Sequence, residues 1–314
     1  MLKLAVAPVP YHWPRARILS FYADLAKAPC EILYLGETVC AKRRALTPQD
    51  WLDLAETLRA AGKEVLLSSL SLIEAASEVS TQRRLCAGSE FLIEANDLGA
   101  VTRLRGREFV AGPGINLYNP RFLTRLHALG MRRWIVPIEL SRQGLETMQA
   151  HCPVDVETEV IGWGRLPLAH SARCFTARVQ GLAKDECALS CADHPDGLVL
   201  YTQNEQPFLC LNGVQVQSAL SHCLIDAVET LQQLGIHSLR LIPQSEGFDA
   251  VLRTFDQVRR GATTASSAVE ALGRLAPTGL CNGYFHGISG MDWVAPPQVP
   301  QGQASLDAPA PRKQ

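Results

Sequence analysis

Short apolar segments recur along the chain, and the intervals between them carry helical patterns. Near-continuous runs of this kind are typical of parallel strands that are covered on both faces. We therefore expect strands at 2–9, 31–36, 64–70, 90–95, 108–114, 133–140, 154–163 and 238–245.

The clearest helix signals stand between these runs. Thr47-Pro48-Gln49-Asp50 combines an N-cap, a proline at the first helical position and an acidic residue three after the cap. Asn119-Pro120 opens a second pattern, and Gly62 and Gly130 stand where the two helices should stop.

Eight strand-then-helix units predict an α/β fold, a (β/α)8 TIM-barrel-like domain over residues 1–294. A doubly wound sheet is the alternative. The interval between the seventh and eighth strands is much longer than the others, which predicts an insertion at about 164–236. This insertion should hold two short strands, around YTQ and FLCLNG, and a helix from about Val214 to Leu234.

The two ends of the sequence and its net charge limit which classes of protein are expected. Residues 295–314 contain five prolines in twenty positions, which predicts a disordered Pro-rich tail. The formal net charge of −1 argues against a nucleic-acid partner. The first apolar run is interrupted too early for a signal peptide, and no run is long enough for a membrane span. A cytoplasmic protein is expected.

Ten cysteines are many for a reducing compartment, where thiols serve metal binding or redox chemistry more often than disulfides. Cys40 is followed by Cys174-x12-Cys187-x3-Cys191. Four thiolates suit a [4Fe–4S] cluster or a structural zinc. The spacing favours iron–sulfur, because a second zinc knuckle pair is missing; chance is the third interpretation. The remaining cysteines read as small buried hydrophobes: Cys30, Cys86, Cys152, Cys210, Cys223 and Cys281.

Because Cys40 follows the second strand and Cys174 the seventh, both should face the same rim of a barrel. Cations beside these cysteines would offset the negative charge of a cluster: Lys42, Arg43, Arg44, Arg173 and Arg178. Conceivable ligands or proton carriers are His12, His170, His194 and His286. No catalytic residue can be assigned. Gly112-Pro113-Gly114 does not complete a dinucleotide-binding motif.

Several stretches together resemble the collagenase-like peptidase family. The main one is 159–177, EVIGWGRLPLAHSARCFTA, and further ones are 35–37, 40–43, 116–119 and 281–287. The chain departs from the family signature at Trp163-Gly164, at Ser171-Ala172 and at Pro167, where the family has a cluster-ligating cysteine.

The departures point to the ubiquinone-biosynthesis branch of that family. By resemblance, Cys40, Cys174, Cys187 and Cys191 would ligate a [4Fe–4S] cluster, with Cys40 and Cys187 supplying the thiolates of the usual set that are missing from this chain. The resemblance further implies a barrel fold, a heterodimer with a UbiU-like protein, cooperation with the lipid-carrier protein UbiT, and hydroxylation of a prenylated aromatic substrate without dioxygen. Proteolysis is not expected, since no nucleophile is evident. The alternatives are an RNA-hydroxylating family member and a non-catalytic, metal-stabilised scaffold subunit.

Overall fold

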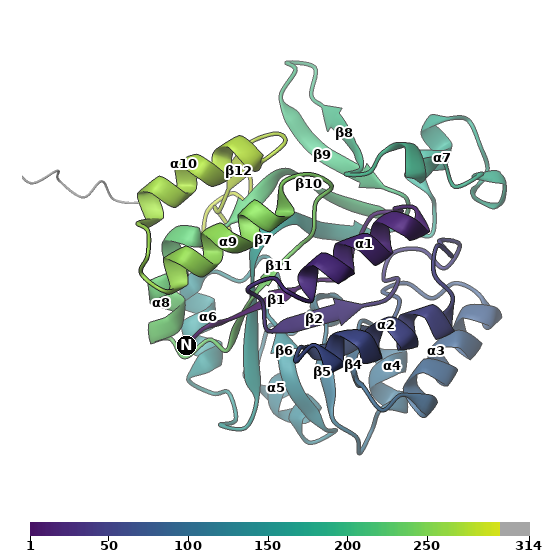
Figure 1. Cartoon of the computed structure of the whole chain (residues 1–314), viewed down its shortest axis with the longest axis horizontal. Helices are drawn as coiled ribbons and strands as arrows, with labels where there is room; N and C mark the ends of the chain where they lie inside the picture. The colour runs from purple at the N-terminus through teal and green to yellow at the C-terminus, as the bar shows by residue number, and fades with distance from the viewer. Residues whose placement is uncertain (296–314) are drawn as a thin grey trace, which may run out of the picture.

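Eight parallel strands close into a barrel in the computed structural model, which describes residues 1–295 (Figure 1). They are β1 (Lys3–Val6), β2 (Ile32–Leu35), β3 (Glu64–Ser68), β4 (Leu92–Ala95), β5 (Phe109–Ala111), β6 (Met131–Ile135), β7 (Glu157–His170) and β11 (Ser238–Leu241). Strand β11 closes the barrel by pairing with both β1 and β7. The expected TIM-barrel-like fold and all eight expected strands are confirmed.

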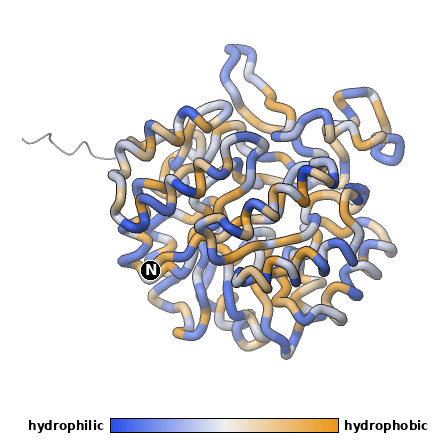
Figure 2. Tube along the Cα trace, viewed as in Figure 1, coloured by the Kyte–Doolittle hydropathy of each residue, from blue (hydrophilic) through white to orange (hydrophobic). Residues whose placement is uncertain are grey.

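Helices cover the outside of the barrel. They are α1 (Arg15–Leu25), α2 (Pro48–Ala60), α3 (Ala76–Gly88), α4 (Leu98–Arg103), α5 (Pro120–His127), α6 (Arg142–Gln149), α8 (Val228–Gln233), α9 (Phe248–Arg259) and α10 (Ala265–Leu275). Thr47 caps α2 in a capping box with Asp50, and Asn119 caps α5, as the sequence predicts. In Figure 2 the colour of the trace changes repeatedly between hydrophobic and hydrophilic along the helices.

The long interval after the seventh strand forms an antiparallel extension of the barrel sheet. Strand β7 continues to His170 and pairs with β10 (Gln215–Cys223), which pairs with β9 (Pro207–Asn212), which pairs with β8 (Leu198–Tyr201). The short strand β12 (Leu280–Cys281) adds to β10. Between β7 and β8 lie α7 (Phe175–Val179) and two single turns, η2 (Lys184–Glu186) and η3 (Ser190–Asp193). Figure 1 shows this part projecting beyond the barrel.

The prediction of a helix from Val214 to Leu234 is wrong. Its first half is strand β10, followed by the turn η4 (Ile225–Ala227) and the short helix α8. Burial in Gln215–Cys223 alternates residue by residue before becoming continuous, which is the period of a strand and not of a helix. The two short strands expected in the insertion are confirmed as β8 and β9.

Two separate apolar clusters form the core. The larger one lies between the sheet and the helices, and the smaller one fills the inside of the barrel with residues such as Ala5, Tyr34 and Ile161. No helix within 1–295 is long and apolar enough to cross a membrane. Apart from Ala295, the tail predicted at 295–314 lies outside the described residues.

Candidate functional site

The four cysteines singled out by the sequence all lie on loops at one rim of the barrel. Cys40 stands in the loop between β2 and α2, and Cys174 is the residue that precedes the first turn of α7. Cys187 ends η2, and Cys191 lies within η3. All four side chains are partly buried. The rim on which they lie is the one where barrel enzymes carry their functional loops.

Two adjacent cations connect the loops that carry these cysteines. Lys42 donates a hydrogen bond of 2.8 Å to the carbonyl of Lys184 and pairs with Asp185 at 3.0 Å. That ion pair raises the pKa of Lys42, and the nearby thiols of Cys187 and Cys40 act in the same direction. The Cys40 loop is thereby fastened to the segment that carries Cys187.

Arg43 is the buried member of the pair, with an exposed fraction of 4%. Its guanidinium donates 2.7 Å hydrogen bonds to the carbonyl of Pro10 and to Oδ1 of Asn212, neither of which is charged. Its Nε finds no acceptor within residues 1–295. Burial acts to lower the pKa of Arg43, but the pKa is raised. The cause is the carboxylate of Glu37 together with the thiols of Cys191 and Cys40, which favour the charged guanidinium when they are ionised.

The thiols respond to the same surroundings. Burial raises the pKa of Cys40 and of Cys191, and Arg43 opposes the shift at both. At Cys191, Arg43 acts by its charge and by a hydrogen bond, while the neighbouring Cys174 raises the pKa further. Arg43 thus favours thiolate over thiol at the two cysteines that it faces.

The backbone around the site is shaped to bring these groups together. Gly213, in the turn between β9 and β10, has φ +65°, and a Cβ there would lie 2.7 Å from Nη2 of Arg43. The carbonyl of Gly213 accepts from Phe175 N at 3.0 Å, which seats α7 and hence Cys174 on this turn. Ala188 and Leu189, between the last two cysteines, both have positive φ. Such conformations are uncommon outside glycine and occur where surrounding structure demands them.

The donor set therefore fits a thiolate-bound metal cluster in its chemistry. Two of the four partly buried thiols, Cys40 and Cys191, lie beside the buried Arg43 with its unused donor, and a negatively charged group there would satisfy both the charge and that donor. Within residues 1–295, no three His, Cys, Asp or Glu side chains are placed so that they could hold one metal ion together.

A cavity of about 480 Å³ opens at the same rim, over the inside of the barrel. Its volume lies in the range of small-molecule sites. Apolar residues form much of its wall, and polar side chains reach it from four barrel strands or their extensions: Glu94, Asn96, His170, Gln215, Gln217 and Arg240. Of these, sequence reasoning singled out only His170. Charged residues within apolar strand segments, such as Glu94 and Arg240, were the signal in the sequence that could have indicated this cavity.

A chain of hydrogen bonds joins the cysteine site to this cavity. Asn212 accepts from Arg43 through Oδ1, so its Nδ2 donates to Pro10 O at 2.7 Å and to Oε1 of Gln215 at 3.3 Å. The amide nitrogen of Gln215 then lies 3.1 Å from Nε2 of His170. Because an amide nitrogen only donates, Nε2 of His170 must accept and the proton must sit on Nδ1. Burial also lowers the pKa of His170, which keeps the ring neutral.

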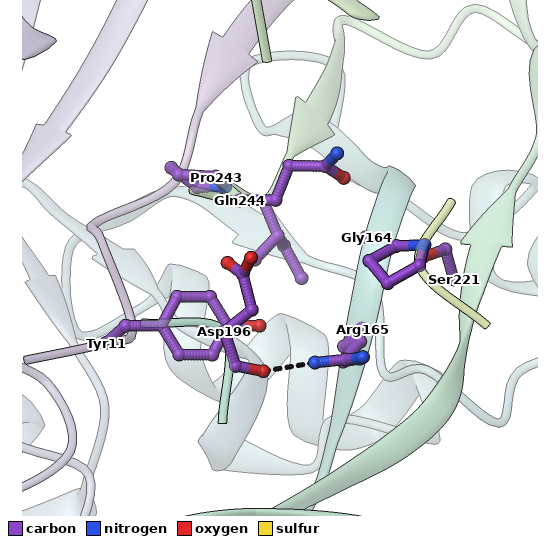
Figure 3. A pocket seen from close by; sticks show the side chains of 9 residues that line it. Tyr11, Gly164, Arg165, Asp196, Ser221, Pro243 and Gln244 are labelled. Atoms are coloured by element: carbon purple, nitrogen blue, oxygen red, sulfur yellow. Dashed lines mark hydrogen bonds between the residues drawn. The ribbon is translucent and has the colours of Figure 1, made fainter. Parts of the chain in front are cut away.

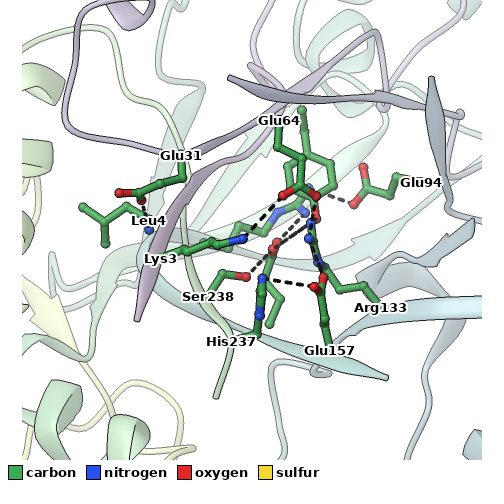
Figure 4. A network of polar contacts seen from close by, with 12 residues as sticks. Lys3, Leu4, Glu31, Glu64, Glu94, Arg133, Glu157, His237 and Ser238 are labelled. Atoms are coloured by element: carbon green, nitrogen blue, oxygen red, sulfur yellow. Dashed lines mark hydrogen bonds and ion pairs between the residues drawn. The ribbon is translucent and has the colours of Figure 1, made fainter. Parts of the chain in front are cut away.

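Below the cavity, the barrel is filled by a charged network (Figure 4). Arg240 pairs with Glu94 at 2.8 Å and with Glu159 at 3.1 Å, and its guanidinium stacks 4.2 Å above the Tyr34 ring. Arg133, which is 1% exposed, pairs with Glu64 at 2.6 Å and with Glu157 at 2.5 Å. The charges of the buried arginines and carboxylates neutralise one another, and their side chains fill the lower end of the barrel.

A second, much smaller cavity lies where the extension meets the barrel, between Tyr11, Arg165, Asp196 and Gln244 (Figure 3). Arg165 donates to the carbonyl of Asp196 there. With a volume of about 10 Å³ this space holds at most one water molecule, so it is a small gap in the packing between the extension and the barrel and not a ligand site.

The other residues expected near a cluster lie in varied surroundings. Arg44, Arg173 and Arg178 are exposed, so Arg43 alone of the predicted arginines is buried. Burial lowers the pKa of His12, and the charge of Arg43 acts the same way. His286 is exposed, and His194 follows η3 directly. Of the six remaining cysteines, Cys152 is partly buried and the others are buried, as expected.

A family model, Peptidase family U32, matches residues 20–294. The chain belongs to this family. Among solved structures, the U32 peptidase Mk0906 is 11% identical, with 78% of this chain and 94% of that chain covered and a TM-score of 0.43. A sialic acid aldolase from Aliivibrio salmonicida is 9% identical, with 88% and 82% covered and a TM-score of 0.45. The family model confirms the resemblance drawn from the sequence motifs at the level of the U32 family.

Proposed function

We propose that this U32 family member is the iron–sulfur subunit of an oxygen-independent hydroxylase that acts on the ubiquinone precursor ring. In its cysteine pattern it resembles UbiV, and we propose that it works as a heterodimer with a UbiU-like protein, with UbiT as the carrier of the prenylated substrate. Cys40, Cys174, Cys187 and Cys191 would hold a [4Fe–4S] cluster.

The observation that carries the proposal is the setting of Arg43. The buried guanidinium of Arg43 faces Cys40 and Cys191, donates its two 2.7 Å hydrogen bonds to neutral oxygens and keeps its Nε unused, so it favours a further negative charge beside these thiols. A thiolate-bound cluster carries such charge and accepts hydrogen bonds at its sulfurs. When bound, it would supply one-electron chemistry.

The cavity beside the cysteines supports a reaction in place of a purely structural cluster. Only Arg43, Asn212 and Gln215 separate the cysteine site from a neutral His170 at the cavity wall. His170 can accept or return a proton there, and the apolar wall can exclude water from an aromatic ring.

Metal and sulfide analysis of protein purified without oxygen tests the cluster. We expect about four irons and four sulfides per chain, the content of a [4Fe–4S] centre. Single Cys→Ala changes at positions 40, 174, 187 and 191 should abolish this content. Cys86→Ala, a buried cysteine in α3, is the matched control and should retain it. One zinc per chain without iron would instead favour the scaffold alternative.

Quinone profiles of an anaerobically grown deletion strain test the reaction. The strain should lack ubiquinone, and wild-type protein, but none of the four cysteine variants, should restore it. A normal quinone content with altered RNA modification would contradict the proposal in favour of an RNA-hydroxylating role.

A further inference from the structure

The floor of the large cavity presents hydrogen-bond acceptors that nothing in the described chain satisfies. Glu94 is 0% exposed, and neither of its carboxylate oxygens accepts a hydrogen bond from residues 1–295. Arg240 Nη2 lies 2.8 Å from Glu94 Oε1, but out of line for a hydrogen bond, so the contact is an ion pair only. Gln217, which is 1% exposed, has an equally unpaired Oε1. Both residues line the cavity.

Three donors of residues that line the same cavity are engaged elsewhere. Asn96 Nδ2 donates to Ser69 O at 2.9 Å, and Gln215 Nε2 contacts His170. Arg165 Nε donates to Ala219 O at 3.1 Å. A buried acceptor without a donor costs about 1–3 kcal/mol, and more when it is charged. The floor is therefore built for a ligand that brings its own donors.

Apolar side chains also line the cavity, beside polar ones such as Thr38, Ser71 and Asn116. Pro8, Ile138, Ile161, Leu168 and Ile242 present apolar surface to the cavity. A flat ring would bury its faces against these side chains.

We propose that this cavity is the binding site for a hydroxylated aromatic ring, whose hydroxyl groups donate to Glu94 and Gln217 while the apolar wall covers its faces. The proposal deepens the proposed function and rests on it for the identity of the natural ligand. The site itself needs neither the cluster nor a partner protein in order to bind a ring.

Calorimetric titration of the full chain with simple rings tests the site. Resorcinol carries two hydroxyl donors, 1,3-dimethoxybenzene has the same ring without them, and cyclohexane-1,3-diol has the hydroxyls without the aromatic ring. We expect resorcinol to bind at least about tenfold more tightly than either, which is the contribution of one hydrogen bond to a charged group. Equal binding of dimethoxybenzene, or tighter binding of the cyclohexane diol, would overturn the proposal.

Variants locate the binding. Glu94→Gln exchanges a carboxylate oxygen for a donor, and Gln217→Leu removes an acceptor; each should weaken resorcinol binding about tenfold. Because Gln217→Leu leaves the ion pair between Arg240 and Glu94 intact, it tests the site even if Glu94→Gln fails to fold. Glu270→Gln, on the exposed face of α10, is the matched control and should bind like wild type. Wild-type affinity in both cavity variants would refute the site.

The two proposals fail in different ways. Resorcinol binding without iron in the protein would leave the cavity assignment intact and refute the cluster. A full cluster without resorcinol binding would refute the cavity assignment alone.

Discussion

Replacing Arg240 by methionine is the sharpest test of how the barrel interior is held. The methionine keeps most of the side-chain volume, but it removes the cation between Glu94 and Glu159, which are both fully buried. Glu159 would keep hydrogen bonds from Tyr34 at 3.0 Å and Ser238 at 2.8 Å. Glu94 would keep none, so the cost falls mainly on this one residue.

Removing one partner of a buried ion pair costs about 3–5 kcal/mol. Because Glu159 stays partly satisfied, we expect the lower end, about 3 kcal/mol of unfolding free energy. For a chain of 314 residues that corresponds to a Tm lower by roughly 5 °C. Urea unfolding followed by circular dichroism, with calorimetry for Tm, measures both quantities.

Two further variants separate the buried pair from a general effect of losing a positive charge. Adding Glu94→Leu to Arg240→Met should recover at least about 1 kcal/mol, because an apolar pair of similar volume replaces the ion pair. Arg274→Met breaks an exposed pair with Glu270 and should cost less than about 0.5 kcal/mol. If Arg240→Met stays within about 1 kcal/mol of wild type, the network does not hold the barrel as argued.

Two other predictions concern stability. Burial lowers the pKa of His222 to about 4, so the folded state binds fewer protons than the unfolded state, and stability should fall by about 2 kcal/mol from pH 7 to pH 5. His222→Gln should remove that loss in urea titrations at the two pH values and His151→Gln, on the surface, should not; an unchanged slope in His222→Gln would contradict the assignment. Gly36→Ala should destabilise by about 1–3 kcal/mol, because Gly36 has φ +122° and a Cβ there would lie 2.9 Å from Ser68 O. Gly62→Ala, also at positive φ but with open space around it, should cost less in the same thermal melts, and equal losses would mean that the contact with Ser68 is immaterial.

Local patterns predicted most of the barrel. Runs of apolar residues identify strands that are buried on both faces, and capping residues such as Thr47 and Asn119 satisfy helix ends using only their own neighbours. The same reasoning failed at 214–234, where a strand precedes a short helix. There the apolar content is compatible with both structures, and pairing with β7 and β9 decides.

The site divides in the same way. Residue type and spacing were enough to identify the four cysteines as candidates, since they restrict the chemistry that thiols can perform. The sequence could not distinguish Arg43 from the exposed Arg44 beside it, nor show that Glu94 and Gln217 meet in one cavity. These features depend on which distant strands become neighbours when the barrel closes. Burial, unpaired acceptors and the path from Arg43 to His170 exist only in the folded chain, because they are properties of contacts and not of residues.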